Sequence, residues 1–140
     1  MLRRTMVSLI AYSVFAGCSE GKGPTDPAAG VSGSWRLQTV NGVSLPFTMS
    51  GNGAVKTELT GEVITLIAPS GVNCVTTFRV TDGAKISTES VPDAGSYTID
   101  GSTVRIKWTS DGSVTTVTVT GDTMTDADSE DGLTFVYRRE

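Results

Sequence analysis

The residue with the most definite chemistry in this chain is Cys18, because of the segment that precedes it. Arg3 and Arg4 form a short basic region, residues 7–15 are mostly apolar, and two small residues stand directly before the cysteine. A basic start, an apolar stretch of about 7–15 residues and a small-residue cleavage site together mark a secretory signal. The apolar stretch is shorter than the about 20 residues that a transmembrane helix needs. We therefore expect residues 1–17 to be a removable signal peptide.

The tetrapeptide Phe-Ala-Gly-Cys at residues 15–18 resembles a lipobox, the cleavage motif of bacterial lipoproteins, with Phe15 where leucine is usual. The resemblance implies that Cys18 becomes the mature N-terminus and carries a diacylglyceryl thioether and an N-acyl chain, which together anchor a protein stably to a membrane. Ser19 is unlike the aspartate that retains lipoproteins in the inner membrane, so the implied location is the cell envelope, on the periplasmic face of an outer membrane. Residues 18–32 are rich in Gly and Pro, as is typical of a flexible tether.

The rest of the chain offers little for catalysis. It contains no histidine, so the commonest general base and metal ligand is absent, and triads in which histidine activates serine or cysteine cannot form. With Cys18 lipidated, Cys74 is the one remaining thiol, too few for a typical zinc site. Its β-branched neighbours indicate a buried strand position rather than a nucleophile. We expect a protein that is not an enzyme and holds no cofactor or metal.

Two groups of carboxylates suggest other chemistry. Residues 126–132 form an acidic run, but counted from Asp126 it lacks the Gly at position six and the Glu at position twelve of a calcium-binding EF-hand loop. A solvated hairpin loop is favoured over a weak cation site. Glu58 and Glu62 would lie on the same face of a strand only if that strand is unbroken. In that case they would form a carboxylate pair of the kind that performs glycosidase chemistry. Gly61 is typical of a bulge, and exposed strand charges are the favoured interpretation.

The charge balance limits the partners. Removing residues 1–17, which hold Arg3 and Arg4 and no acidic residue, takes Lys+Arg from 11 to 9 and leaves Asp+Glu at 15, a net charge of −6. An acidic domain without a basic cluster is a poor nucleic-acid binder. Anionic lipid headgroups also repel it. Attachment to the membrane therefore depends on the acyl chains of Cys18.

The elements that position these residues are strands. Hairpin-type dipeptides such as Asn-Gly and Asp-Gly punctuate residues 33–140, and β-branched runs between them alternate apolar and polar residues. No stretch has a helical period, and residues 88–93 are a candidate turn. We expect eight or nine antiparallel strands, at residues 33–41, 54–61, 62–68, 73–81, 84–90, 96–99, 103–109, 113–120 (with a short continuation at 123–125) and 133–139.

Such a sheet has one apolar face and removes its edges by closing. The predicted fold is therefore all-β, a small antiparallel up-and-down β-barrel over residues 33–140. An eight-stranded barrel has an interior that side chains fill or that holds one small ligand.

The opening of the domain carries a resemblance. Its Gly33-Ser34-Trp35 strand and the Asn-Gly-Val-Ser-Leu-Pro loop at residues 41–46 resemble the start of lipocalin-like bacterial lipoproteins, most of which have no assigned activity. In these proteins a Gly-x-Trp strand closes the bottom of the barrel. The resemblance implies that Arg138 or Arg139, in the last strand, packs across the indole of Trp35.

Two functions compete. The first is a non-enzymatic binding module that takes a small hydrophobic ligand at the barrel mouth. The alternative is an envelope protein-interaction module, similar to barrel inhibitors of proteases or lysozyme, which binds through its loops and has a filled barrel. A continuous apolar cavity of about 300 Å³ or more favours the first, and an exposed apolar loop around Phe47 favours the second. The aromatic side chains that contact a ligand or partner, or else fill the barrel, are Phe47, Phe78, Tyr97, Trp108, Phe135 and Tyr137.

Overall fold

The computed structural model describes residues 30–127 and 129–140. The predicted signal peptide, Cys18 and the tether as far as residue 29 lie outside the described residues. The predicted domain at residues 33–140 begins where the first described strand begins.

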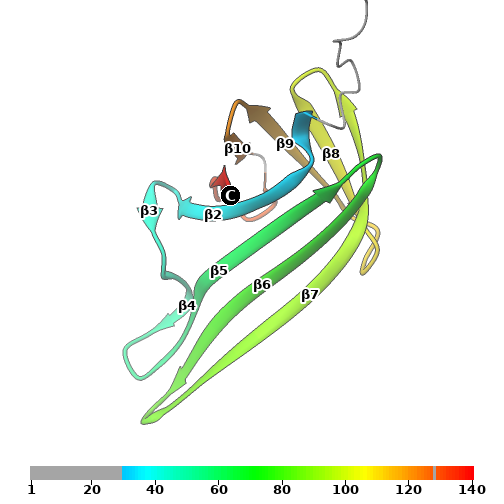
Figure 1. The fold of residues 1–140 in the computed structure, drawn as a ribbon. Coiled ribbons are helices and arrows are strands. Elements are labelled where there is room, and N and C mark those ends of the chain that lie inside the picture. The colour runs from blue at the N-terminus through cyan, green and yellow to red at the C-terminus, as the bar shows by residue number, and fades with distance from the viewer. Residues whose placement is uncertain (1–29, 128) are drawn as a thin grey trace, which may run out of the picture.

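Within the described residues, ten strands form a single antiparallel sheet (Figure 1). Hairpins connect most of them, and glycines with positive φ occupy several of the turns, such as Gly42 (φ 79°) and Gly101 (φ 66°). The strands are β2 (Gly33–Val40), β3 (Val43–Ser44), β4 (Phe47–Asn52), β5 (Val55–Ile67), β6 (Gly71–Asp82), β7 (Lys85–Asp100), β8 (Thr103–Trp108), β9 (Val114–Thr120), β10 (Thr123–Asp126) and β11 (Phe135–Arg139).

The sheet closes into a barrel. Its strand order is β3-β2-β11-β10-β9-β8-β7-β6-β5-β4, and β2 also pairs with β5, from Gly33 opposite Leu66 to Arg36 opposite Val63. The wall therefore has eight strands, with β3 and β4 as additions beside β2 and β5. The prediction of an all-β, small antiparallel barrel is confirmed.

Two strands continue through breaks that the sequence predicted. β5 runs through Gly61, where two separate strands were expected, because a bulge between Leu59 and Gly61 shifts the register without ending the pairing to β6. β7 runs through residues 88–93, so the candidate turn there is wrong. Pro92 is compatible with a strand at this point because β7 pairs with β8 only from Gly95 onward. Its missing N–H therefore faces an open edge.

The barrel core is built by alternation. Residues such as Trp35, Leu66, Val104, Ile106 and Met124 are fully buried inside it, as expected for the inward positions of strands with one solvated face.

The barrel has two distinct ends. The antiparallel order places the start of β2 and the end of β11 at one end, here called the closed end. The opposite end, here called the mouth, holds the loop between β8 and β9 and the loop between β10 and β11. β5, β6 and β7 have 13, 12 and 16 residues and project past the mouth together with β4 (Figure 1), whereas β8 has 6. We call this projecting four-stranded part the extension.

Candidate functional site

At the closed end, Arg139 covers Trp35. The guanidinium carbon lies 4.3 Å from the centroid of the indole ring. Arg139 Nη1 and Nη2 donate hydrogen bonds of 2.8 Å to the carbonyl oxygens of Ser32 and Gly30, and Trp35 Nε1 donates one of 2.9 Å to the carbonyl of Val31. One arginine and one indole thus fasten the incoming chain across the end of the barrel.

The sequence left two arginines open for this position, and strand alternation separates them. Tyr137 is buried and inward-facing, so the side chain of Arg138 points outward, where it is exposed, while Arg139 returns to the inner side. Arg138 lies opposite Arg36 on the outer surface. The contacts of Arg139 at the closed end are structural, because they join the incoming chain to the Trp35 ring.

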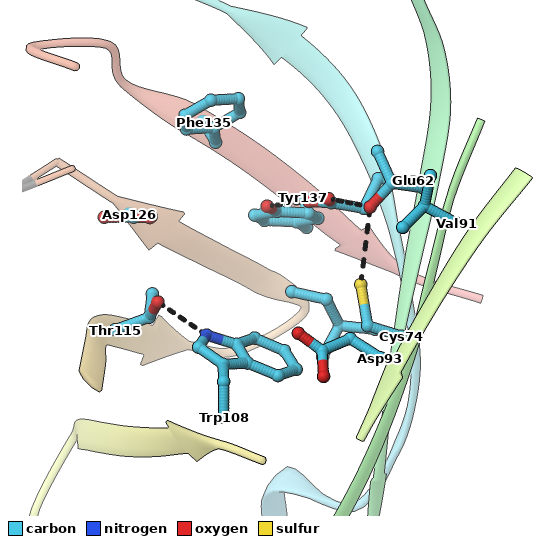
Figure 2. A pocket seen from close by; sticks show the side chains of 11 residues that line it. Glu62, Cys74, Val91, Asp93, Trp108, Thr115, Asp126, Phe135 and Tyr137 are labelled. Atoms are coloured by element: carbon cyan, nitrogen blue, oxygen red, sulfur yellow. Dashed lines mark hydrogen bonds between the residues drawn. The ribbon is translucent and has the colours of Figure 1, made fainter. Parts of the chain in front are cut away.

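The mouth contains a cavity of about 260 Å³ (Figure 2). It is lined by side chains from β5 to β11, both apolar and polar. The lining residues are Glu62, Ile64, Cys74, Thr76, Val91, Asp93, Trp108, Thr115, Asp126, Phe135 and Tyr137. The interior is therefore filled at the closed end and hollow at the mouth. The cavity is smaller than the about 300 Å³ that is the criterion for a hydrophobic-ligand site, and it is not continuously apolar.

Of the six aromatic candidates, Trp108, Phe135 and Tyr137 line this cavity. Tyr97 is only 3% exposed and belongs to the core. The other two, Phe47 and Phe78, are half-buried and lie opposite each other across Leu59 of β5, on the extension. Phe47 is the first residue of β4 and packs against the core, so it is not the exposed loop aromatic that the sequence indicated.

Glu62 is the central polar group of the cavity. Its Oε1 accepts a hydrogen bond of 2.5 Å from the Tyr137 hydroxyl, and its Oε2 accepts one of 2.6 Å from Thr76 Oγ1. Trp108 is fixed in a similar way, because its Nε1 donates a bond of 2.8 Å to Thr115 Oγ1. These bonds fix the orientation of the carboxylate and of the indole.

Glu58 and Glu62 do not form a carboxylate pair. Glu58 lies opposite Arg79 and Glu62 opposite Thr76 on the regular strand β6, so the bulge between them puts them on opposite faces. The expectation that both are exposed is wrong. Glu58 is 5% exposed on the outer face, where Arg79 (2.9 Å) and Lys56 (3.4 Å) form ion pairs with it. The hydrogen bond from Arg79 is the main cause that lowers the pKa of the Glu58 carboxyl.

The cavity disfavours ionisation of Cys74 and Tyr137. Burial first, and then the charge of Glu62, raises the pKa of Cys74 to about 12. Burial followed by the charge and hydrogen bond of Glu62 raises the pKa of the Tyr137 hydroxyl well above its usual value. Cys74 is a buried free thiol. Because the thiolate is the reactive form of cysteine, this residue is a poor nucleophile at neutral pH.

A second hollow of about 180 Å³ adjoins the first and shares Thr115 and Asp126 with it. Asp111 and Glu130 also line it. Asp111 accepts hydrogen bonds from the hydroxyl (2.7 Å) and backbone N–H (2.9 Å) of Ser113, which lower the pKa of its carboxyl. The acidic run is therefore not one solvated loop, because Asp126 is the last residue of β10 and is 7% exposed.

The sequence analysis missed the polar lining of the cavity, although a signal was present. Glu62 stands two residues before the apolar Ile64, and Thr115 stands two residues before Val117. Alternation places these polar residues on the inward face. In a sequence, a polar residue at an inward-facing position near the end of a strand therefore indicates a side chain that lines the mouth of a barrel.

In the part of the chain that the structure describes, no group of three or more Cys, Asp and Glu side chains is arranged to hold a metal ion. Over the same residues, no helix has the length and apolar character needed to cross a membrane.

No family model matches the chain, and neither a curated protein nor a solved structure is significantly similar to it.

Proposed function

We propose that this protein is a non-enzymatic binding module that takes a small molecule at the mouth of its barrel and is held at an envelope membrane by acyl chains on Cys18. The observation that carries the proposal is the preformed cavity of about 260 Å³ at the mouth. Ligand sites are typically concave, largely preformed, and lined by aromatic groups with a few fixed polar ones. Its volume fits a fragment-sized molecule with an apolar body and a polar group.

The binding role is favoured over catalysis by the state of the cavity groups. Cys74 stays protonated at neutral pH because its pKa is raised to about 12, and Glu62 is engaged on both oxygens by Tyr137 and Thr76. Neither is set up as a nucleophile next to a general base. The groups are arranged for recognition.

Ligand-observed NMR with a set of small aromatic and aliphatic fragments tests the binding proposal. The mouth is blocked with Val91→Trp, because Val91 lines the cavity and is 49% exposed, so a larger side chain there leaves the core intact. Ile86→Trp is the matched control, on the same strand but outside the cavity and 64% exposed. We expect fragment signals that persist in Ile86→Trp and vanish in Val91→Trp. Signals of equal strength in both variants would contradict the proposal.

The anchor is tested separately. A Cys18→Ser variant removes the thiol that acylation requires, so we expect the protein to move from the membrane fraction to the soluble fraction. Mass spectrometry of the native protein should show a lipid-modified Cys18 as the first residue. An unmodified N-terminus at any other position would overturn the anchoring proposal while leaving the cavity proposal intact.

A second candidate, partner binding, is favoured by one observation. The extension carries exposed apolar side chains near its tip, with Val55 61% and Ile86 64% exposed. Scattered single apolar residues are common on protein surfaces, so this argument is weaker than the cavity. Dose-dependent inhibition of lysozyme or trypsin that is lost in Val55→Asp would favour this candidate, and full enzyme activity at every dose would remove it.

A further inference from the structure

The two hollows at the mouth share an unusual charge pattern. Carboxylates occur in both linings, namely Glu62, Asp93 and Asp126 in the larger and Asp111, Asp126 and Glu130 in the smaller. None of the residues that line either hollow is a lysine or arginine. A concave site with one sign of charge and walls of low polarity concentrates ions of the opposite sign.

Two carboxylates of the cavity, Glu62 and Asp93, accept hydrogen bonds from neutral groups. Glu62 accepts from two hydroxyls. Asp93 accepts bonds of 2.8 Å from the Ala94 backbone N–H and from Ser110 Oγ. These bonds fix the orientation of both side chains but leave their negative charge uncompensated.

Glu58 shows the contrast within the same strand. It lies on the outer face of β5 and is at least as buried as the cavity carboxylates, and two cations, Arg79 and Lys56, neutralise it. Among the described residues, no lysine or arginine lies within ion-pair distance of Glu62 or Asp93. A buried charge normally has a partner of opposite sign. Glu62 and Asp93 are half-buried and have no cationic partner among the described residues, so a cation from outside the chain can fill that role.

The aromatic groups of the cavity fit the same kind of partner. Trp108, Phe135 and Tyr137 line it together with the carboxylates, and Figure 2 shows Trp108, Tyr137 and Asp93 directed into one space from different strands. Because the hydrogen bond to Thr115 holds the Trp108 ring, its face is presented in a fixed orientation. Aromatic faces beside carboxylates are the combination that recognises ammonium groups.

We propose that the ligand of this cavity is a small organic cation, an amine or quaternary ammonium compound with an apolar body. This inference rests on the proposed binding function and names the ligand class for the same site. The ammonium group lies near the carboxylates of Glu62 and Asp93, and the apolar body lies against Trp108 and Phe135. Burial is the main cause of the raised pKa values of Cys74 and Tyr137, and the charge of Glu62 is the second cause; this second contribution is the one that also favours a cation.

The test compares two probes of nearly equal shape, phenethylammonium and 2-phenylethanol, on the full chain with Cys18→Ser. Binding is measured by isothermal titration calorimetry at pH 7. We expect phenethylammonium to bind at least about tenfold more tightly, because the charge interacts with carboxylates in a partly desolvated site. The preference should fall to about threefold or less in Asp93→Asn, which removes one charge at constant shape. Asp100→Asn is the matched control, exposed and at the closed end of the same strand, and it should retain the full preference.

Three results would overturn the inference. Equal affinity for the two probes, abolished for both by Val91→Trp, leaves the binding function in place and removes the ligand class. If Asp93→Asn and Asp100→Asn reduce the preference for phenethylammonium over 2-phenylethanol equally, that preference reflects only the net charge of the domain. Tight binding of a trilysine peptide without binding of phenethylammonium assigns the acidic mouth to a basic protein partner instead.

Discussion

Replacement of Arg139 by alanine should destabilise the barrel far more than the same change at its neighbour Arg138. Arg139 donates two hydrogen bonds of 2.8 Å to backbone carbonyls and stacks 4.3 Å from the centroid of the Trp35 ring. Bonds from a charged donor contribute about 1.5 kcal/mol each at the low end of their range, and the stacking contributes about 1 kcal/mol. The ion pair with Asp122 is exposed and contributes little.

The net effect is smaller than these contributions together. When the native protein unfolds, the Arg139 side chain regains conformational entropy that favours the unfolded state by about 2 kcal/mol. The alanine variant has no such entropy to regain, so this difference offsets part of the lost contacts. We therefore expect Arg139→Ala to lower the free energy of unfolding by about 2 kcal/mol, and the melting temperature by roughly 8 °C for a domain of this size. Arg139→Lys should lose about half as much, because lysine keeps the charge over the ring but lacks the planar fork that reaches both carbonyls.

Urea unfolding followed by circular dichroism measures these differences. Arg138→Ala is the control, since Arg138 is exposed on the outer face, and its effect should stay within about 0.5 kcal/mol. Quenching of Trp35 fluorescence by acrylamide, measured in a Trp108→Phe background, should rise in Arg139→Ala. If Arg139→Ala and Arg138→Ala unfold at the same urea concentration, the assignment of Arg139 as the residue that closes the barrel is refuted.

Three further predictions concern Cys74 and Gly95. The pKa of the Cys74 thiol is 9.0 in the unfolded chain and about 12 in the folded protein. Because the folded pKa is raised, the protonated thiol contributes its full stabilisation of the fold below pH 9. This contribution is lost as the pH rises from 9 toward 12. Urea unfolding should therefore show a loss of about 1.4 kcal/mol at pH 10 that Cys74→Ala lacks, and an identical pH profile for both proteins would contradict it. At pH 8 the folded thiol should react with iodoacetamide about 1,000-fold more slowly than in urea, in proportion to its thiolate fraction; comparable rates would show that the cavity does not suppress ionisation. Gly95→Ala should destabilise the fold by about 2 kcal/mol or more, because its Cβ would lie 2.2 Å from the carbonyl oxygen of Lys107, whereas Gly61→Ala, with no atom within 4 Å, should be near neutral; equal melting temperatures for the two would disprove the steric argument.

The barrel itself was predictable because its information is local. β8 and β11 carry an alternation that can be recognised within a few residues, and Asn-Gly and Asp-Gly turns separate several of the strands. The Gly-x-Trp strand and the terminal arginines likewise stand at recognisable places in the chain. Their contact depends only on which side of β11 each arginine faces, which Tyr137 decides.

The extension and the cavity were not predictable in the same way, because they depend on neighbours far along the chain. In isolation, Gly61 and Pro92 resemble strand breaks. In the structure, Gly61 lies at a bulge that keeps β5 paired with β6, and Pro92 lies on an open edge beyond the end of β8. Glu62 resembles a solvent-facing charge until Tyr137, 75 residues away, donates to it. A polar cavity of this kind becomes visible only when the closure of the sheet brings several strands together.

The direction in which the chain enters the barrel has a consequence for how a ligand would arrive. The described chain reaches β2 at the closed end, on the side of Arg139, and the cavity opens at the opposite end. A lipid anchor on Cys18 would therefore pull on the sealed base of the barrel. With the proposed anchor attached at that end, the mouth stays unobstructed by the tether, so a ligand can enter from solution as a diffusing solute does.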